Sequence, residues 1–397
     1  MGRAGVGIKN MIAKNLLLYL ILIIIPDLYI FKQYIRPKKI SVSKKLLWFI
    51  PMLVMIVFTL YMATSRHFAP DNYTVFTVYL AMFGLLVCTK LAFMVFSVIG
   101  RGVARLFHSH NNWGNLVGLI MAFFTAYASI YGLTAGFNKF DVNRLELTFK
   151  DLPAAFDGYR FVLFSDAHVG SFTGSRASML REAYDSINAQ QADAIFFVGD
   201  LQNVKPEEIE PHRHLLNSLQ SRDGVFSVLG NHDYSDYFNG TDEEKAAIEA
   251  EMVEKQRQLG WRLLNNEHAI VRHGGDSIFI AGMENDGEGR FVQKGDLKKT
   301  VEGIPDGAFT IMLEHDPSSW QRTILPGCKA QLTLSGHTHG GQVGLLGLTA
   351  YSLTNTEHDG LYAEGDRLLF VSRGLGGLLP FRYGVTAEIV VITLKKG

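Results

Sequence analysis

The sequence predicts an α/β domain preceded by an all-α membrane region of about four helices. Three observations support this prediction: four long apolar runs occupy the first third of the chain, strand and helix patterns alternate after them, and the two parts carry opposite charge. The 397 residues include 38 Lys and Arg against 38 Asp and Glu, so the formal net charge is zero. Residues 1–145 hold 15 basic and 3 acidic side chains, a net charge of +12, which leaves −12 for residues 146–397. We therefore place a domain boundary near residue 145.

Composition excludes two other classes of protein. Hydrophobic residues make up 48% of the chain and charged residues 19%, which excludes a disordered chain. The chain has two cysteines, Cys88 and Cys328, which are too few for a disulfide scaffold. Residues 146–397 are numerous enough to bury a sizeable hydrophobic core of their own.

The four apolar runs predict transmembrane helices. They cover residues 12–31, 46–63, 74–99 and 115–133. Each run approaches the roughly 20 residues that a helix needs to cross the hydrocarbon core of a bilayer. A secretory signal explains only the first run, and soluble helices rarely lack a polar face four times in succession. The chain is therefore predicted to be a multi-pass integral membrane protein.

Two charged residues, Asp27 and Lys90, interrupt the apolar runs. The favoured interpretation is that each side chain either snorkels to the membrane interface or lies at a helix end, and the alternative is a functional site inside the membrane. The fourth run also contains glycines at GxxxG spacing, which permits close helix packing. These glycines, which lie towards the ends of the run, are Gly114, Gly118, Gly132 and Gly136.

Loop charge predicts the orientation in the membrane. The loop at 32–45 holds six Lys or Arg and the loop at 100–114 holds two, whereas the second loop holds only Arg66. The positive-inside rule then places the first and third loops in the cytoplasm and both termini outside. We expect residues 146–397 to be extracytoplasmic, on a protein of the cell (inner) membrane. Lys139 and Arg144 argue weakly in the other direction.

Five short apolar runs in the second part predict buried strands. They cover residues 159–164, 194–198, 225–229, 309–313 and 331–334, are rich in Phe, Val, Ile and Leu, and are bounded by polar turns. Between the first two, residues 176–190 carry apolar side chains at helical spacing. This alternation predicts an α/β fold, in which functional sites form at the carboxyl ends of strands.

Metal-binding residue types follow each of these five runs directly. The set comprises Asp166, His168, Asp200, Asn231, His315, His337 and His339. It contains no thiolate, and its carboxylates, imidazoles and amide oxygen suit Mn²⁺ best in our interpretation, with Fe or Zn²⁺ as alternatives. Seven ligands are too many for one catalytic ion, so we expect two divalent metal ions that share a carboxylate. Such a pair stabilises the attacking and leaving oxygens of a phosphoryl displacement.

The order of these motifs resembles the calcineurin-like metallophosphoesterase superfamily. D-x-H, GD, GNHD, a single His shortly before Pro, and GHTHGG follow one another along the chain. Flanking segments, among them Gly158-Tyr-Arg and the tail through Phe381-Arg382, are similar to the bacterial membrane-associated or exported branch named after YkuE and YaeI. The resemblance covers about residues 146–397. It implies a four-layer αββα metallophosphoesterase sandwich.

The resemblance also implies a role for each site residue. Asp166, His168 and His339 would bind one metal, Asn231, His315 and His337 would bind the other, and Asp200 would bridge them. A metal-bridging hydroxide would attack phosphorus in line, so that a phosphate mono- or diester is hydrolysed.

Two further residues are implied to act on the substrate. His232 would protonate the leaving oxygen or stabilise the transition state, and Asp233 would orient His232. The sequence departs from the family pattern at Ala167, where Leu is common, and at Asp316, which separates His315 from Pro317. Neither departure removes an expected ligand.

Two classes of function remain open from the sequence. The first is a membrane-anchored phosphoesterase that acts on a phosphorylated lipid, an envelope component or a nucleotide derivative, and the second is a catalytically silent membrane sensor or binding protein. Nucleic acid is not expected as a specific partner, because residues 146–397 are acidic and carry no basic stripe. Acidic residues at 207–210 and 242–259 are expected on solvated helix faces. Segment 343–362 is expected to line the substrate pocket.

Overall fold

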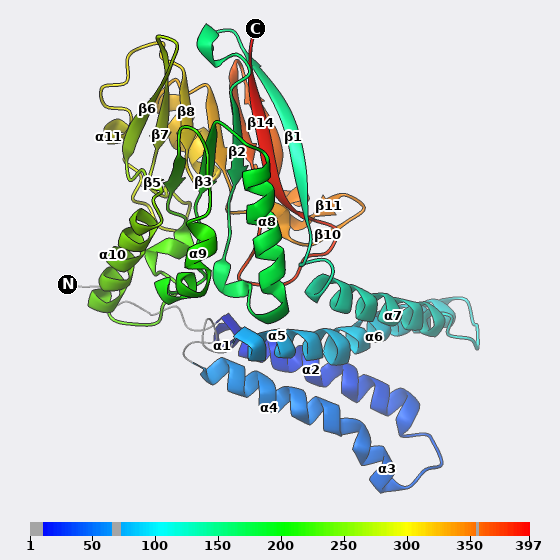
Figure 1. The fold of residues 1–397 in the computed structure, drawn as a ribbon. Helices are drawn as coiled ribbons and strands as arrows, with labels where there is room; N and C mark the ends of the chain where they lie inside the picture. The colour runs from blue at the N-terminus through cyan, green and yellow to red at the C-terminus, as the bar shows by residue number, and fades with distance from the viewer. Residues whose placement is uncertain (1–10, 66–72, 355–356) are drawn as a thin grey trace, which may run out of the picture. The chain divides into compact units, whose positions relative to one another are not determined.

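The computed structural model describes residues 11–65, 73–354 and 357–397 (Figure 1). Arg66, on which the orientation prediction draws, lies outside these ranges. The chain divides into two compact units, one that ends at Thr134 and one that comprises Ala135–Gly397.

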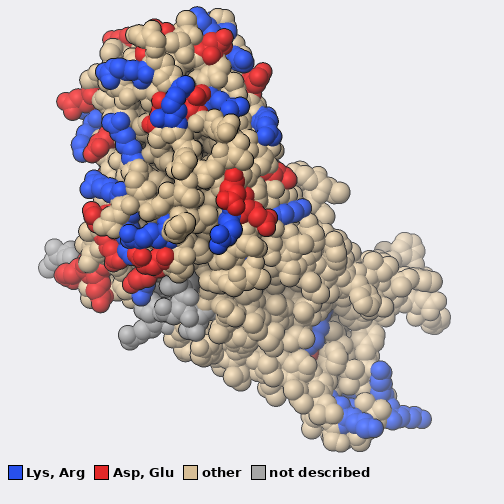
Figure 2. Space-filling view, in the orientation of Figure 1, with Lys and Arg blue, Asp and Glu red and all other residues tan. Residues whose placement is uncertain are grey.

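Within the described residues the membrane unit contains four long helices, three of them built from consecutive helical segments and the fourth from α7 alone. The segments are α1 (Met11–Lys14), α2 (Leu16–Ile30), η1 (Phe31–Ile35), α3 (Val42–Leu46), η2 (Leu47–Phe49), α4 (Ile50–Thr64), α5 (Tyr73–Met82), η3 (Phe83–Cys88), α6 (Thr89–Leu106) and α7 (Gly114–Leu133). Four continuous stretches are long and apolar enough to cross a membrane: Leu16–Ile35, Val42–Thr64, Tyr73–Leu106 and Gly114–Leu133. The surface of this unit is nearly free of charge in Figure 2, apart from a cluster of Lys and Arg around α3.

Asp27 and Lys90 contact each other inside the membrane unit. Lys90 Nζ donates to both carboxylate oxygens of Asp27, at 2.8 and 2.9 Å, and Asp27 is 2% exposed. Asp27 therefore lies in the last turn of α2 as a buried, paired carboxylate, and not as a side chain that snorkels alone to the membrane interface. A charge within the hydrocarbon region is costly unless it is paired, and this pair joins α2 to α6.

Two of the four GxxxG glycines make the close helix contact that their spacing suggests. A methyl group added at Gly114 would lie 2.2 Å from the carbonyl oxygen of Phe96, and one at Gly118 would lie 2.8 Å from that of Phe93. Both contacts join α7 to α6, so only glycine allows the two backbones to approach this closely.

The second unit is built around two six-stranded sheets within the described residues. The first has the order β1 (Phe140–Phe149), β14 (Ala387–Lys396), β2 (Arg160–Phe164), β3 (Ala194–Val198), β4 (Val225–Val228) and β5 (Arg262–Leu263). The second has the order β12 (Gly360–Glu364), β13 (Arg367–Val371), β9 (Leu332–Ser335), β8 (Thr310–Leu313), β7 (Asp276–Gly282) and β6 (Glu267–His273). A two-stranded hairpin of β10 (Gly344–Leu345) and β11 (Leu348–Thr349) lies outside both sheets.

Three hydrophobic clusters define four layers. Alternate residues of both sheets, such as Phe196 of β3 and Ile311 of β8, share one cluster between the sheets. The other face of the first sheet packs against α8 (Ala177–Ala189) and α10 (Asp242–Gln258). The other face of the second sheet packs against Trp320 and Ile324 of η9 (Trp320–Ile324), with α11 (Leu297–Thr300) and α12 (Leu325–Gly327) beside it. The predicted αββα arrangement is therefore present.

Candidate metal centre

The predicted ligands lie at the carboxyl ends of five strands. Asp166 and His168 follow β2, Asp200 follows β3, and Asn231 begins η8 (Asn231–Tyr234) after β4. In the second sheet, His315 follows β8, and His337 and His339 follow β9. The strands β2, β3 and β4 run parallel to one another, as do β8 and β9, so each sheet presents its ligands at one rim.

The backbone at this rim is unusual for residues that carry side chains. Five of the seven predicted ligands have positive φ: Asp166 (49°), His168 (42°), Asp200 (62°), His337 (72°) and His339 (53°). A left-handed conformation is uncommon outside glycine and costs on the order of 1–3 kcal/mol for such a residue. Strain of this kind persists only where the surrounding fold enforces it, and it is typical of functional sites.

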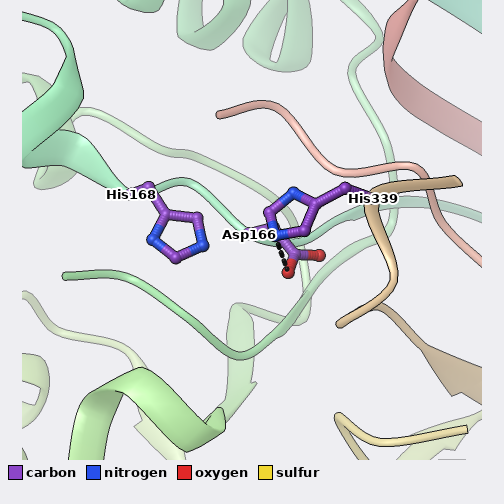
Figure 3. Close-up of side chains that lie close together, drawn as sticks. All are labelled: Asp166, His168 and His339. Atoms are coloured by element: carbon purple, nitrogen blue, oxygen red, sulfur yellow. Dashed lines mark ion pairs between the residues drawn. The ribbon is translucent and has the colours of Figure 1, made fainter. Parts of the chain in front are cut away.

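Asp166, His168 and His339 form the first cluster (Figure 3). Their ligand atoms lie within 4.8 Å of one another, and His339 Nε2 is 3.5 Å from Asp166 Oδ1. The rings of His168 and His339 stack with centroids 5.2 Å apart. The three side chains that the family resemblance assigns to one metal are thus neighbours.

Asn231, His315 and His337 form the second cluster. Asn231 Oδ1 lies 2.7 Å from His337 Nδ1 and 3.2 Å from His315 Nε2. The other ring nitrogen of His315 is 2.7 Å from the carbonyl oxygen of Val198, which fixes the ring against β3. The amide oxygen of Asn231, which follows a strand of the first sheet, therefore contacts two imidazoles that follow strands of the second sheet.

Asp200 contacts both clusters. Its Oδ2 lies 3.5 Å from His168 Nε2 and 3.3 Å from His315 Nε2. Its Oδ1 accepts a hydrogen bond from the backbone N–H of His232 at 2.8 Å. One carboxylate thus lies between the two groups of ligands.

Burial and the charge of nearby carboxylates together set the protonation of these groups. Burial raises the pKa of Asp166 to about 6 and lowers the pKa of His168 to about 3. Burial would also lower the pKa of His315, but the charge of Asp200, with a smaller effect of Asp166, outweighs it and raises that pKa to about 10. The carboxylates therefore stabilise positive charge at this rim, while the His168 ring stays neutral near pH 7 and keeps a lone pair for a metal.

A separate observation, the lack of hydrogen-bond partners for buried ring nitrogens, also indicates that these residues fit a metal site. His168 is fully buried, yet neither of its ring nitrogens has a hydrogen-bond partner among the residues that the structure describes. The same holds for His339 Nδ1. Buried polar atoms are normally satisfied, and nitrogens left without a partner beside a carboxylate are what a metal-ligand set offers before a cation binds.

His232 is held beside the first cluster. Its Nδ1 donates to the carbonyl oxygen of Asn203 at 2.6 Å, and its ring stacks on Tyr237 with centroids 3.9 Å apart. The Tyr237 hydroxyl in turn accepts from Asn231 Nδ2 at 3.0 Å. Asn203 and Tyr237 were not found by sequence reasoning, because neither belongs to a recognisable motif. With Nδ1 occupied, Nε2 is the nitrogen left to exchange a proton.

Asp233 does not take the position expected of it. Its carboxylate accepts hydrogen bonds from the backbone N–H groups of Asp200, Leu201, Gln202 and Gly230, at 2.9–3.2 Å. The ring of His232 is oriented instead by the Asn203 carbonyl. Asp233 thus holds the turn that carries Asp200, and the prediction that it orients His232 is corrected accordingly.

Glu208 is buried, although its sequence context predicts a solvated helix face. Its two oxygens accept from the backbone N–H groups of Asn203, Val204 and Lys205 at 2.7, 2.8 and 3.0 Å. Because the Asn203 carbonyl holds His232, Glu208 supports that histidine through the backbone.

Replacing Glu208 with Ala should therefore lower both stability and turnover. The change leaves three amides without their acceptor, which costs about 1–3 kcal/mol for each buried group that stays unpaired. We expect a lower free energy of unfolding and a reduced kcat, with the metal content unchanged. Urea titration, steady-state kinetics and metal analysis test this, and the exposed neighbour substitution Glu207→Ala is the matched control. Equal stability of the two variants would contradict the role given to Glu208.

Glycines let the chain pass close to Asp166. A methyl group at Gly336 would lie 2.5 Å from Asp166 Oδ2, and one at Gly374, where φ is +68°, would lie 2.6 Å from Asp166 Cβ. The segment around Gly374 is held by the buried Arg382, whose guanidinium donates to the carbonyl oxygens of Arg373 and Gly376, each at 2.8 Å. Arg382 lies in the tail that carries the family resemblance, which was the only sequence signal for it.

Asp316, a departure from the family pattern, also lies near the second cluster. Its carboxylate is buried, and Oδ2 is 3.7 Å from His337 Nε2. The extra acidic residue therefore adds negative charge beside the predicted ligands.

The chain belongs to the calcineurin-like phosphoesterase family. A family model described as "Calcineurin-like phosphoesterase" matches residues 159–341, and one described as "Probable Calcineurin-like phosphoesterase, transmembrane domain" matches residues 12–137. The chain is thus a membrane-associated member of a family of metal-dependent phosphoester hydrolases.

Among its relatives, "Uncharacterized metallophosphoesterase YkuE" of Bacillus subtilis is 30% identical over 276 residues, which cover 67% of this chain and 90% of the relative. "Transmembrane protein with metallophosphoesterase domain" of Danio rerio is 30% identical over 281 residues, which cover 68% of this chain. This chain spans only 61% of the length of that fish relative. "UDP-2,3-diacylglucosamine pyrophosphatase LpxG" of Chlamydia trachomatis is 25% identical over 304 residues, which cover 64% of this chain and 89% of the relative.

Proposed function

We propose that this protein hydrolyses a phosphoester or phosphoanhydride bond of a lipid-linked substrate, at a centre that binds two divalent metal ions. Asp166, His168 and His339 are the ligands of one ion in this proposal, and Asn231, His315 and His337 are those of the other. The position of Asp200 between the two clusters is the observation that supports a shared, dinuclear centre most strongly. Mn²⁺ is the proposed ion, with Fe and Zn²⁺ as alternatives that the same donors accept.

When bound, such a pair of ions supplies Lewis-acid stabilisation of phosphoryl oxygens and lowers the pKa of a water molecule. The residues of the chain provide the rest of the chemistry. The ligand side chains would hold the ions in fixed positions, because the turn of Asp200 is held by Asp233 and Gly336 lets the chain approach Asp166 closely. His232, oriented by Asn203, exchanges a proton with the leaving oxygen through Nε2.

A lipid-linked substrate is favoured by two findings. The described part of the chain has four helices long and apolar enough to cross a membrane, and the relative LpxG is named as a pyrophosphatase of UDP-2,3-diacylglucosamine, a diacylated sugar nucleotide. An extracytoplasmic domain on a protein of the inner membrane, as loop charge predicts, is part of this proposal. The intact ligand set together with His232 favours an enzyme over a catalytically silent sensor.

Purified full-length protein in detergent tests the proposal directly. Loaded with Mn²⁺, it should release phosphate or a nucleotide from phosphatidic acid or UDP-2,3-diacylglucosamine, and it should cleave 4-nitrophenyl phosphate or its diester more slowly. Metal analysis should give two ions per chain. A protein that carries both ions and cleaves none of these compounds would contradict the proposal and favour the sensor.

A further inference from the structure

The hairpin that follows the metal ligands has an unusual tip. Strands β10 and β11 pair through Gly344 with Thr349 and Leu345 with Leu348, so Leu346 and Gly347 form a two-residue turn. Both turn residues have positive φ, 54° and 81°. Turns of this kind favour Asn-Gly or Asp-Gly, because a bulky side chain is strained in the left-handed region.

Leucine therefore occupies a position where the backbone favours a polar residue. Leu346 is also 95% exposed, so its side chain packs against almost nothing within the described structure. Neither turn geometry nor core packing accounts for a leucine at this position. An apolar environment outside the two sheets would account for it.

The surroundings of the tip are apolar as well. Among the described residues of the α/β unit, the large hydrophobic side chains that are exposed are those of Val343, Leu345, Leu346, Leu348 and Leu361. The sequence holds no Asp, Glu, Lys or Arg between Lys329 and Glu357. Charged side chains are plentiful elsewhere on this unit (Figure 2). We call residues 343–349 the apolar finger.

The apolar finger is fixed to the backbone that carries His339. At its base, Gly344 N–H donates to the Tyr383 carbonyl at 2.7 Å, and Tyr383 N–H donates to the Gln342 carbonyl at 3.0 Å. A methyl group at Gly341 would lie 3.2 Å from Thr349 Cβ, so the second strand of the finger packs against the end of η10 (His339–Gly341). Whatever binds the finger is thereby held close to the predicted metal ligands.

We propose that the apolar finger inserts into bilayer lipid and holds the metal centre at the lipid surface. The connection between α7 and β1 comprises only residues 134–139, so the α/β unit is joined to the membrane-spanning helices by a short tether. The finger spans seven residues, far fewer than the roughly 20–30 residues that each side of a stable protein–protein interface contributes. An uncharged, leucine-rich tip matches the apolar part of a bilayer better than the charged surface of a partner protein.

This inference deepens the proposed function. It rests on that function only where it assumes that the substrate is drawn from the bilayer into which the finger inserts. The insertion itself is independent of catalysis and is tested first. The full chain, with Cys88 and Cys328 replaced by Ser, carries an environment-sensitive dye at Leu346→Cys and is reconstituted in phosphatidylcholine vesicles that contain a bilayer-embedded quencher. The matched control places the dye at Asp366→Cys, an exposed position in the turn between β12 and β13.

If the finger inserts, the fluorescence emission of the dye at position 346 should be shifted to the blue relative to the dye at position 366. The bilayer-embedded quencher should also quench the dye at position 346 several-fold more strongly. Equal emission and equal quenching at the two sites would overturn the proposal. Because this fluorescence measurement needs no substrate, it shows whether the finger inserts even if the protein proves to be inactive.

A second variant separates insertion from folding. Leu346→Asn suits the turn and removes the apolar tip, so it should fold normally, and any loss of rate on soluble 4-nitrophenyl phosphate should be several-fold smaller than the loss on phosphatidic acid in vesicles. Its turnover of phosphatidic acid in vesicles should fall several-fold. Unchanged turnover in vesicles would overturn the role of the finger in substrate access, whereas a wild type inert to every ester would count against the proposed function alone.

Discussion

Replacing Asp200 with Asn is expected to abolish hydrolysis and to lower the metal content of the protein. Asp200 Oδ2 lies within 3.5 Å of His168 and within 3.3 Å of His315, so one carboxylate contacts both clusters of ligands. The amide removes a negative charge from a buried site that is proposed to bind two cations. We expect kcat/KM on an aryl phosphate to fall about 10³-fold or more, which corresponds to about 4 kcal/mol of transition-state stabilisation.

Kinetics in the presence of Mn²⁺, together with elemental analysis of the purified variant, measure this effect. Asp185→Asn on the exposed face of α8 is the matched control and should behave as the wild type does. The backbone N–H of His232, which donates to Asp200 Oδ1, retains an acceptor in the amide oxygen of the substituted side chain, so the fold should survive. Unchanged hydrolysis in the Asp200 variant would refute the assignment of the whole centre.

The strands and the rim could be predicted because their signals are local. The runs at 194–198 and 225–229 match β3 and β4 to within one residue, since buried parallel strands are continuously apolar and end at Gly or Asp. Helix α8 could be predicted as well, because its apolar residues recur at helical spacing, which is also a local signal. Once the strands are located, parallel neighbours place Asp166, Asp200 and Asn231 at one edge without further information.

The supporting contacts could not be predicted, because they depend on tertiary structure. Lys90 and Asp27 are 63 residues apart, and hydropathy alone gives no indication that they pair. The acidic context of Glu208 indicates solvent, whereas the fold turns its carboxylate onto three backbone amides. The hydrogen bonds of the Asp233 carboxylate to backbone N–H groups could not be predicted either, since an acidic residue next to a histidine in the sequence suggests a contact between their side chains.

The strained turns at the rim also lie beyond sequence reasoning. Glycine is the usual sign of positive φ, yet the residues that adopt it here are Asp and His. Asp166 and Asp200 are held in this conformation by the segments around them, including Gly374 beside Asp166 and the Asp233 carboxylate beside Asp200. The site is therefore preorganised by its neighbours and not by its own local propensity.

Replacing His232 with Asn is expected to reduce turnover while the metal content stays the same. His232 Nδ1 is held by the Asn203 carbonyl at 2.6 Å, and an Asn side chain can still donate to that oxygen, so the local structure should persist. Loss of the other ring nitrogen removes proton exchange with the leaving oxygen, an effect typically worth about 10²–10⁴-fold in rate. The loss should be larger with an alkyl or lipid phosphate, whose leaving oxygen needs a proton, than with 4-nitrophenyl phosphate, whose leaving anion is already stable.

That dependence on the leaving group separates two roles for His232. A general acid predicts a large difference between the two substrates, whereas a purely electrostatic role predicts the same loss with both, because charge on the transferring phosphoryl group is common to them. The exposed His214→Asn variant is the matched control and should leave both rates unchanged. If the His232 variant also loses metal, the histidine acts as a ligand, since its ring lies within 4.8 Å of the ligand atoms of His168 and Asp200. The two rates and the metal content, measured on one variant, therefore assign His232 as general acid, electrostatic stabiliser or ligand.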